Sequence, residues 1–109
     1  MKLSSKPTLR EKKRYIYFRI HSQGPLKYLD ARNAIFDSIF DIIGELGSAR
    51  ANPHLVKNLW NQKDQTCVLR CSHLFVDQIK LALSLLHQIG EEKVIFQSLR
   101  VSGTIKGTK

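Results

Sequence analysis

The stretch RYIYFRIHS, residues 14–22, alternates apolar and polar side chains. Ile16, Phe18 and Ile20 are apolar, whereas the residues between them are aromatic, basic or polar. This period of two is typical of a strand with one buried face and one open face. Gly24 and Pro25, in the following SQGPL (22–26), are expected to end the strand. The chain therefore begins with a half-buried strand.

An amphipathic helix is expected next, from Leu26 or Asp30 to about Leu46. Its apolar residues recur at helical spacing, and its acidic residues fall on the other side. The apolar stripe consists of Ala31, Ile35, Ile39, Ile42 and Leu46. We expect the helix to stop near Gly47 and GSARANP (47–53) to form a turn.

The remainder of the chain reads as two strands, a helix and a final strand. HLVKNLWN (54–61) and QTCVLRCS (65–72) are strand candidates that suit a hairpin. Ser72 can cap a helix over HLFVDQIKLALSLLHQIG (73–90) that ends at Gly90. KVIFQSLRVSG (93–103) then alternates as a fourth strand.

The order strand, helix, strand, strand, helix, strand predicts an α+β fold. Two interlocked strand-helix-strand units give a ferredoxin-like, RRM-like βαββαβ sandwich. We expect a four-stranded antiparallel sheet with both helices on one face. The predicted organisation is a basic N-terminal arm (1–13), a single RRM-like domain (14–103) and a short basic C-terminal tail (104–109).

The positive charge of the chain is concentrated at its two ends. The formal net charge is +9, of which +5 lies in residues 1–14 and +3 in residues 100–109. In the predicted topology the first and last strands are antiparallel neighbours, so the two basic ends converge on one edge of the sheet. Such a patch favours a polyanion, because lysine and arginine neutralise phosphates.

Three side chains beside this patch have two readings each. Tyr15 and Tyr17 can stack on bases or merely cover sheet surface. Arg70, a charge within an apolar strand, is either an RNA contact or simply an exposed position on the open face. TCVLRC (66–71) lacks the glycine and aromatic pattern with which RNA-recognition motifs stack bases, so we expect binding to phosphate and shape.

The sequence offers weak support for catalysis, nucleotide binding or metal binding. LRVSGTIKGTK (99–109) departs from the spacing of a phosphate-binding loop. SQGPLKY (22–28) keeps Gln23 and Gly24 of an acylphosphatase-like loop but not the pattern that follows them. No set of catalytic side chains or metal ligands is persuasively spaced, so we predict no catalytic residue, no metal site and no cofactor bound by this chain. Cys67 and Cys71 are interpreted as buried small residues.

Apolar residues also lie on the flanks of both helices, beyond what one sheet contact needs. A protein partner would cover them, although loops of the same chain are an alternative explanation. They are Phe36, Phe40, Ile43, Leu81 and Leu85. The chain lacks a membrane-spanning run and a signal peptide, so we expect a cytoplasmic protein without a membrane partner.

Five motifs in order resemble the small ribonuclease P protein of archaea and eukaryotes, the Pop5 type. They are PTLREKKRYIYF (7–18), GELGSARA (44–51), LRC (69–71), LAL (81–83) and VSGTIK (101–106). The resemblance implies a noncatalytic RNA-binding subunit of ribonuclease P, which removes the 5′ leader of precursor tRNA. It places the catalysis and the magnesium ions on the RNA subunit.

The same resemblance implies partners and contact residues. The partners are ribonuclease P RNA, precursor tRNA, a TIM-barrel-like subunit (component 3) and other ribonuclease P proteins. Family motifs assign RNA contact to Arg10, Lys12, Lys13, Arg14, Tyr15, Gly103, Thr104 and Lys106. Tyr17, Arg19, Arg70 and Arg100 join this predicted RNA-binding set. The alternatives are a ribosomal-type RNA-binding protein and, more remotely, an acylphosphatase-like or small-ligand regulatory domain.

Overall fold

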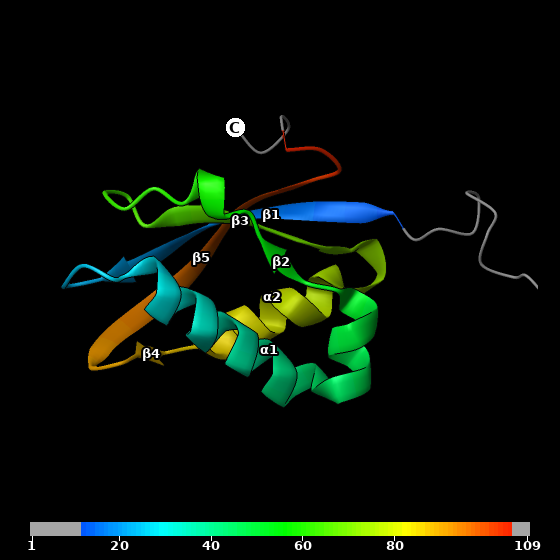
Figure 1. Ribbon diagram of the computed structural model, residues 1–109, viewed down its shortest axis with the longest axis horizontal. Coiled ribbons are helices and arrows are strands. Elements are labelled where there is room, and N and C mark those ends of the chain that lie inside the picture. Colours follow the sequence, from blue (N-terminus) through cyan, green and yellow to red (C-terminus); the bar gives the residue numbers. More distant parts are fainter. Residues whose placement is uncertain (1–11, 106–109) are drawn as a thin grey trace, which may run out of the picture.

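A five-stranded antiparallel sheet and two α-helices form the computed structural model, which describes residues 12–105 (Figure 1). The longer strands are β1 (Lys13–Ser22), β3 (Thr66–Ser72) and β5 (Glu92–Ser102), and the short strands are β2 (His54–Leu55) and β4 (Gln88–Ile89). The helices are α1 (Tyr28–Ala51) and α2 (Val76–Leu85), with 3₁₀ turns η2 (Lys57–Leu59) and η3 (His73–Phe75). The fold class is α+β, as predicted.

The first strand, β1, lies at the centre of the sheet, whose order is β2-β3-β1-β5-β4. It pairs antiparallel with β3 on one side and with β5 on the other. The β1–β5 pairing shifts register between Tyr17 and Phe18, where Leu99 is the extra residue of a bulge. The predicted pairing of the first and last strands is confirmed.

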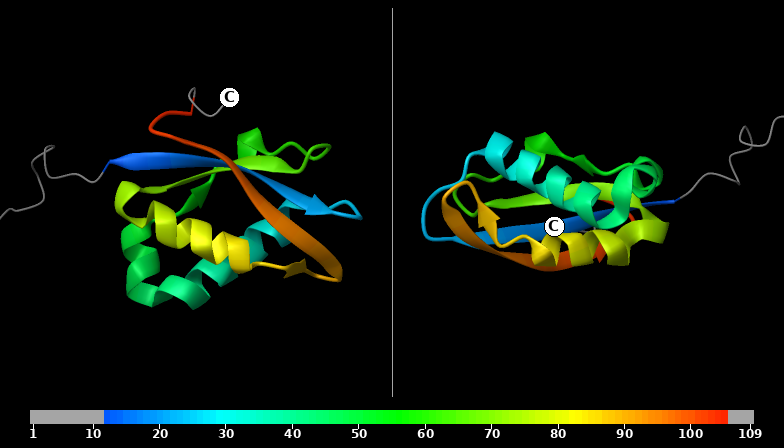
Figure 2. Two further views of the ribbon diagram at one scale, coloured as in Figure 1. Left: turned by 180° about the vertical axis from the view of Figure 1, so that it is seen from behind. Right: turned by 90° about the horizontal axis from the view of Figure 1, so that it is seen from below.

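Both α-helices cover the same face of the sheet, as Figure 2 shows from two sides. Ile16, Phe18 and Ile20 of β1 are almost completely buried against them. Ile35 and Ile39 of α1 and Ile79 and Leu83 of α2 belong to the same core. The alternation in RYIYFRIHS therefore assigns the core face of β1 correctly.

The first helix runs farther than predicted: it is interrupted at Gly44, but it continues past Gly47 to Ala51. Gly44 has φ 76° and ψ −177°, and helical geometry resumes after it up to Ala51. Ala51 is fully buried in the core, which anchors this last segment. Asn52, with φ 49°, forms the C-cap and donates its N–H to the carbonyl of Ser48.

The segment expected to be a strand over 54–61 is a strand only at His54–Leu55. Its continuation turns into η2, and the ring of Trp60 packs edge-on to Tyr28 with their centroids 5.9 Å apart. The side-chain carbonyl of Asn61 accepts the N–H groups of Lys63 and Asp64, which closes the turn before β3. Packing against α1 thus overrides the apolar pattern.

The second helix ends at Leu85, five residues before the predicted end at Gly90. Gly90, with φ 61°, instead makes the turn between β4 and β5, so the sheet has five strands where four were expected. The N–H of Val94 also bonds the carbonyl of His87. The pairing of residues 87–89 with β5 competes successfully with continuation of the helix.

Candidate nucleic-acid interface

The open face of the sheet gathers five residues of the predicted RNA-binding set. Tyr15 lies opposite Arg70 of β3, and Tyr17 lies opposite Arg100 of β5. Arg19 follows on the same side of β1, two residues farther along. Directly paired residues of an antiparallel sheet point to the same face. The register therefore brings together, on the face opposite the helices, side chains that are up to 85 positions apart in sequence. Figure 1 shows the three strands that carry them.

These five side chains differ in exposure. Arg19 and Arg100 are exposed, whereas Tyr15, Tyr17 and Arg70 are half-buried. The tyrosines thus cover part of the sheet and still expose part of each side chain. An aromatic group with one accessible side between cations suits stacking on a base beside a bound phosphate.

The residues that lead to the two chain ends lie side by side. Tyr15 of β1 pairs with Ser102 of β5. A Cβ atom placed on Gly103 would lie 3.5 Å from the Nη1 atom of Arg14. Because β1 is central, this meeting point is the end of two neighbouring strands and not the outer edge of the sheet. Lys12, Lys13 and Thr104 are exposed nearby, whereas Arg10 and Lys106 lie outside the described residues.

Two histidines that were not in the predicted set share the open face. His54 of β2 lies opposite Arg70, and His21 extends the row of β1. The Nε2 atom of His21 is 2.7 Å from the Oε1 atom of Gln97. The alternation in RYIYFRIHS already indicates the face of His21. The position of His54 depends on the pairing of β2, which sequence pattern alone does not reveal.

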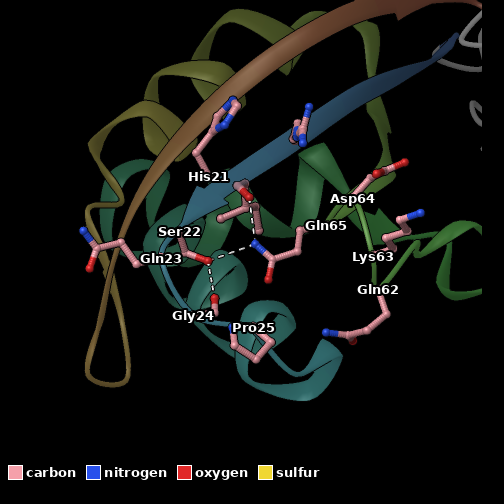
Figure 3. Close-up of a pocket in the computed structure, with 11 residues that line it drawn as sticks. His21, Ser22, Gln23, Gly24, Pro25, Gln62, Lys63, Asp64 and Gln65 are labelled. Atoms are coloured by element: carbon pink, nitrogen blue, oxygen red, sulfur yellow. Dashed lines mark hydrogen bonds between the residues drawn. The ribbon is translucent and has the colours of Figure 1, made fainter.

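At the other end of β1, the loop after the strand is held by a buried glutamine (Figure 3). The side-chain Nε2 of Gln65 donates to the carbonyl of Ile20 and to the hydroxyl of Ser22, both at 2.9 Å. Its Oε1 accepts the N–H of Leu26 at 2.8 Å. Gln65 has φ 54° and is 8% exposed. It belongs to the wall of a cavity of about 310 Å³ and fixes the geometry of that wall.

Two backbone amides of this loop are already used within the protein. The N–H of Gly24 donates to the Glu92 carboxylate at 2.8 Å, and that of Leu26 donates to Gln65. A Cβ on Gly24 would lie 2.9 Å from the same carboxylate, so a larger residue there would displace the Glu92 side chain. A phosphate cradle needs free amides and positive surroundings. The arrangement therefore disfavours the acylphosphatase-like alternative.

The five apolar residues predicted at a protein interface lie on two flanks of the helix layer. Phe40, Leu81 and Leu85 are exposed, whereas Phe36 and Ile43 are half-buried. The Ser38 hydroxyl donates to the Ala82 carbonyl, which identifies the side of α1 that faces α2. Phe36 and Phe40 are each two positions from Ser38, about 200° around the helix. The α1 residues therefore lie on the flank away from α2, whereas Leu85 shares a surface cavity with Ser38 and Asp41.

The two cysteines occupy the core, as predicted. Cys67 and Cys71 are free thiols with at most 1% exposure. Burial raises the pKa of each thiol to about 11. Both therefore remain protonated at neutral pH and act as small apolar residues.

Two further properties concern the described part of the chain only. Between residues 12 and 105, no three histidine, cysteine or acidic side chains gather in a way that could hold a metal ion. Neither α-helix in that range is long and apolar enough to cross a membrane.

Comparison with known proteins gives consistent matches. The Rpp14/Pop5 family model matches residues 14–109. "Ribonuclease P protein component 2" of Thermococcus kodakarensis is 41% identical over 103 residues, which cover 94% of this chain and 84% of the relative. The protein of the same name from Methanocaldococcus jannaschii is 39% identical, with 94% and 74% covered. A chain in the cryo-EM structure of yeast ribonuclease MRP has the same fold, with a TM-score of 0.64, 14% identity and coverage of 87% and 76%.

Proposed function

The chain belongs to the Rpp14/Pop5 family and is a protein subunit of ribonuclease P, and from this premise we propose that it binds the RNA of that enzyme through the open face of its sheet. The resemblance seen in the motifs is thus confirmed by the comparisons. The proposed role is noncatalytic: the chain supports the catalytic RNA, which removes the 5′ leader of precursor tRNA with magnesium ions of its own. The cytoplasm is the expected compartment.

The single observation that carries the RNA proposal is the register of the three longer strands. It sets Tyr15 against Arg70 and Tyr17 against Arg100, on a face that neither α-helix covers. Phosphate neutralisation by several cations supplies affinity that depends on salt, and base stacking adds to it. At one end of β1, the exposed residues Lys12 and Lys13 adjoin this surface, and Arg14 lies beside Gly103 of the strand that leads to the other chain end.

A second surface of the proposal is the helix layer. Phe40, Leu81 and Leu85 are each about half exposed, although each is a large apolar residue. Covering such area with another protein is favourable by about 25 cal/mol per Å². We assign this layer to the TIM-barrel-like subunit implied by the motifs, and the RNA-binding face remains accessible because it lies on the other side of the sheet.

We also propose that the sheet is of the ferredoxin-like type. The order β2-β3-β1-β5 is that of a ferredoxin-like sheet with two helices on one face, and β4 adds a short fifth strand at its edge. In such a fold the open face is the natural binding surface, since the other face is filled by the core.

The RNA proposal is tested by measuring the affinity of the full chain for ribonuclease P RNA at several salt concentrations. Arg19→Gln removes an exposed cation from the open face. We expect about tenfold weaker binding. We also expect the slope of log affinity against log salt to fall by about 0.7 to 0.9.

Lys80→Gln is the matched control, because Lys80 is an exposed cation of α2 on the helix side. It should bind RNA like the wild type. Identical behaviour of Arg19→Gln and Lys80→Gln would contradict an RNA-binding open face.

A further inference from the structure

A small cavity is lined by residues from the start of β1, the end of α1 and the end of β3. Figure 1 shows where these elements lie in the fold. The volume of the cavity is about 130 Å³. Three of the residues that line it, Lys13, Arg50 and Arg70, are basic, and none of the lining residues is acidic. Arg50 belongs to none of the residues that the motifs assign to RNA.

The three basic residues around this cavity belong to three different elements, which fix the positions of their backbones. Lys13 is the first residue of β1, and Arg70 lies in β3 opposite Tyr15. Arg50 is in the last turn of α1, and its guanidinium carbon lies 5.7 Å from the centroid of the Phe75 ring. Contact with an aromatic face orients a guanidinium without using its N–H donors for the protein.

The electrostatics of the cavity favour an anion. The carboxyl end of α1 contributes about half a negative charge through its carbonyl groups. Three full positive charges from Lys13, Arg50 and Arg70 outweigh this dipole. The volume exceeds the roughly 30 Å³ share of one water molecule several times, so the oxygens of a phosphate can replace water there.

We propose that Lys13, Arg50 and Arg70 together bind one backbone phosphate of RNA. This inference rests on the proposed function, because Arg70 connects the cavity to the open face. β2 pairs with β3 only at Leu69 and Arg70. The last two residues of β3, Cys71 and Ser72, lie beyond this pairing and line the cavity. The RNA then passes from the open face around the sheet to the end of α1.

The test measures RNA affinity and its salt dependence for Arg50→Gln, Arg70→Gln and the double variant, with Lys80→Gln as the control. Arg50→Gln should bind about tenfold more weakly. Its salt slope should fall by about 0.7 to 0.9. Because both arginines contact one phosphate, the double variant should lose clearly less than the product of the two single losses.

Other variants separate failure of this site from failure of the whole interface. Arg50→Lys keeps the charge and should keep the salt slope, and thermal unfolding verifies that each variant is folded. Wild-type binding by Arg50→Gln, while Arg19→Gln is impaired, would overturn the cavity site alone. Independent, multiplicative losses at Arg50 and Arg70 would exclude a shared phosphate. Wild-type binding by Arg19→Gln as well would overturn the RNA-binding face itself.

Discussion

At the scale of single residues, Gln65 has three properties that the sequence pattern does not predict. It adopts a positive φ, it is buried, and its amide joins Ile20, Ser22 and Leu26. The sequence pattern places Gln65 only at the start of a predicted strand. Its partners lie 39 to 45 positions away, so their proximity is a property of the tertiary structure.

Replacing Gln65 with methionine should lower the free energy of unfolding by about 3 kcal/mol, because the buried N–H of Leu26 and carbonyl of Ile20 lose their side-chain partner. Denaturant unfolding measures the change. Gln62→Met is the control, because Gln62 is exposed although its side-chain amide donates to the Leu26 carbonyl. This substitution should lower the free energy of unfolding by less than about 1 kcal/mol. Equal effects of the two substitutions would contradict a special role for Gln65.

The sequence predicts which face of the sheet each side chain of β1 occupies. It does not predict the surroundings of Arg70 and Arg50, which lie on other elements. The period of two separated Ile16 and Phe18 from Tyr15 and Tyr17 correctly, because each step along a strand reverses the face. The half-burial of Arg70 and the position of Arg50 depend on neighbouring elements. Arg50 was expected in a turn and instead lies in the last turn of α1.

At the scale of elements, the decisive feature of α1 is the glycine at which it breaks. Gly44 combines φ 76° with an extended ψ, a region that only glycine adopts at low cost, and a Cβ there would meet no atom within 4 Å. The obstacle to a side chain is therefore backbone strain and not space. The periodicity predicts the helix, but it does not indicate that the break falls at Gly44 or that the helix continues to the buried Ala51.

Gly44→Asn should lower the free energy of unfolding by about 1 to 3 kcal/mol. Gly90→Asn tests the cause, since Gly90 has φ 61° in a turn, where asparagine is tolerated. The Gly90 variant should lose less than about 1 kcal/mol by the same reasoning. Thermal unfolding of both variants provides the comparison, and a cost at Gly90 equal to that at Gly44 would refute the strain argument.

The two flanks of the helix layer can be tested separately as binding surfaces for the protein partner. Phe40→Asp changes the flank of α1 that faces away from α2, and Leu85→Asp changes α2 beside Asp41. We expect each to abolish co-purification with the TIM-barrel-like subunit while the domain stays folded, because a charge would be buried without a partner. Lys80→Glu is a control that should retain the partner. Undiminished co-purification by either aspartate variant would remove that flank from the interface.

At the scale of the whole molecule, the distribution of charge and the strand topology together support an RNA-binding function most strongly. The prediction that the two basic ends converge requires the first and last strands to be neighbours, and the pairing of Tyr15 with Ser102 confirms that these strands are neighbours. The short strand β4 was not predicted. The apolar run over residues 81–89 fits a helix throughout, and it fits equally well a helix that is followed by a short strand. Element order was thus predictable, and the element ends were decided by packing.

Deletion of residues 1–11 should weaken RNA binding and reduce the salt slope by up to about 2 to 3, since it removes Lys2, Lys6 and Arg10. The deletion leaves Lys12, whose carbonyl accepts the N–H of His73, so the sheet should remain intact. Affinity titrations at several salt concentrations measure the effect. An unchanged slope would show that the N-terminal arm does not contact phosphate.

The central position of β1 also governs the order in which the protein can assemble. The first strand to leave the ribosome has both neighbours, β3 and β5, far behind it in the chain. Its apolar side chains must therefore wait for nearly the entire chain before the sheet can close, and contacts of such long range slow folding. Because Tyr15 and Ser102 are already adjacent, a circular permutant that joins the two ends would turn the β1–β5 pair into a local hairpin and should fold faster.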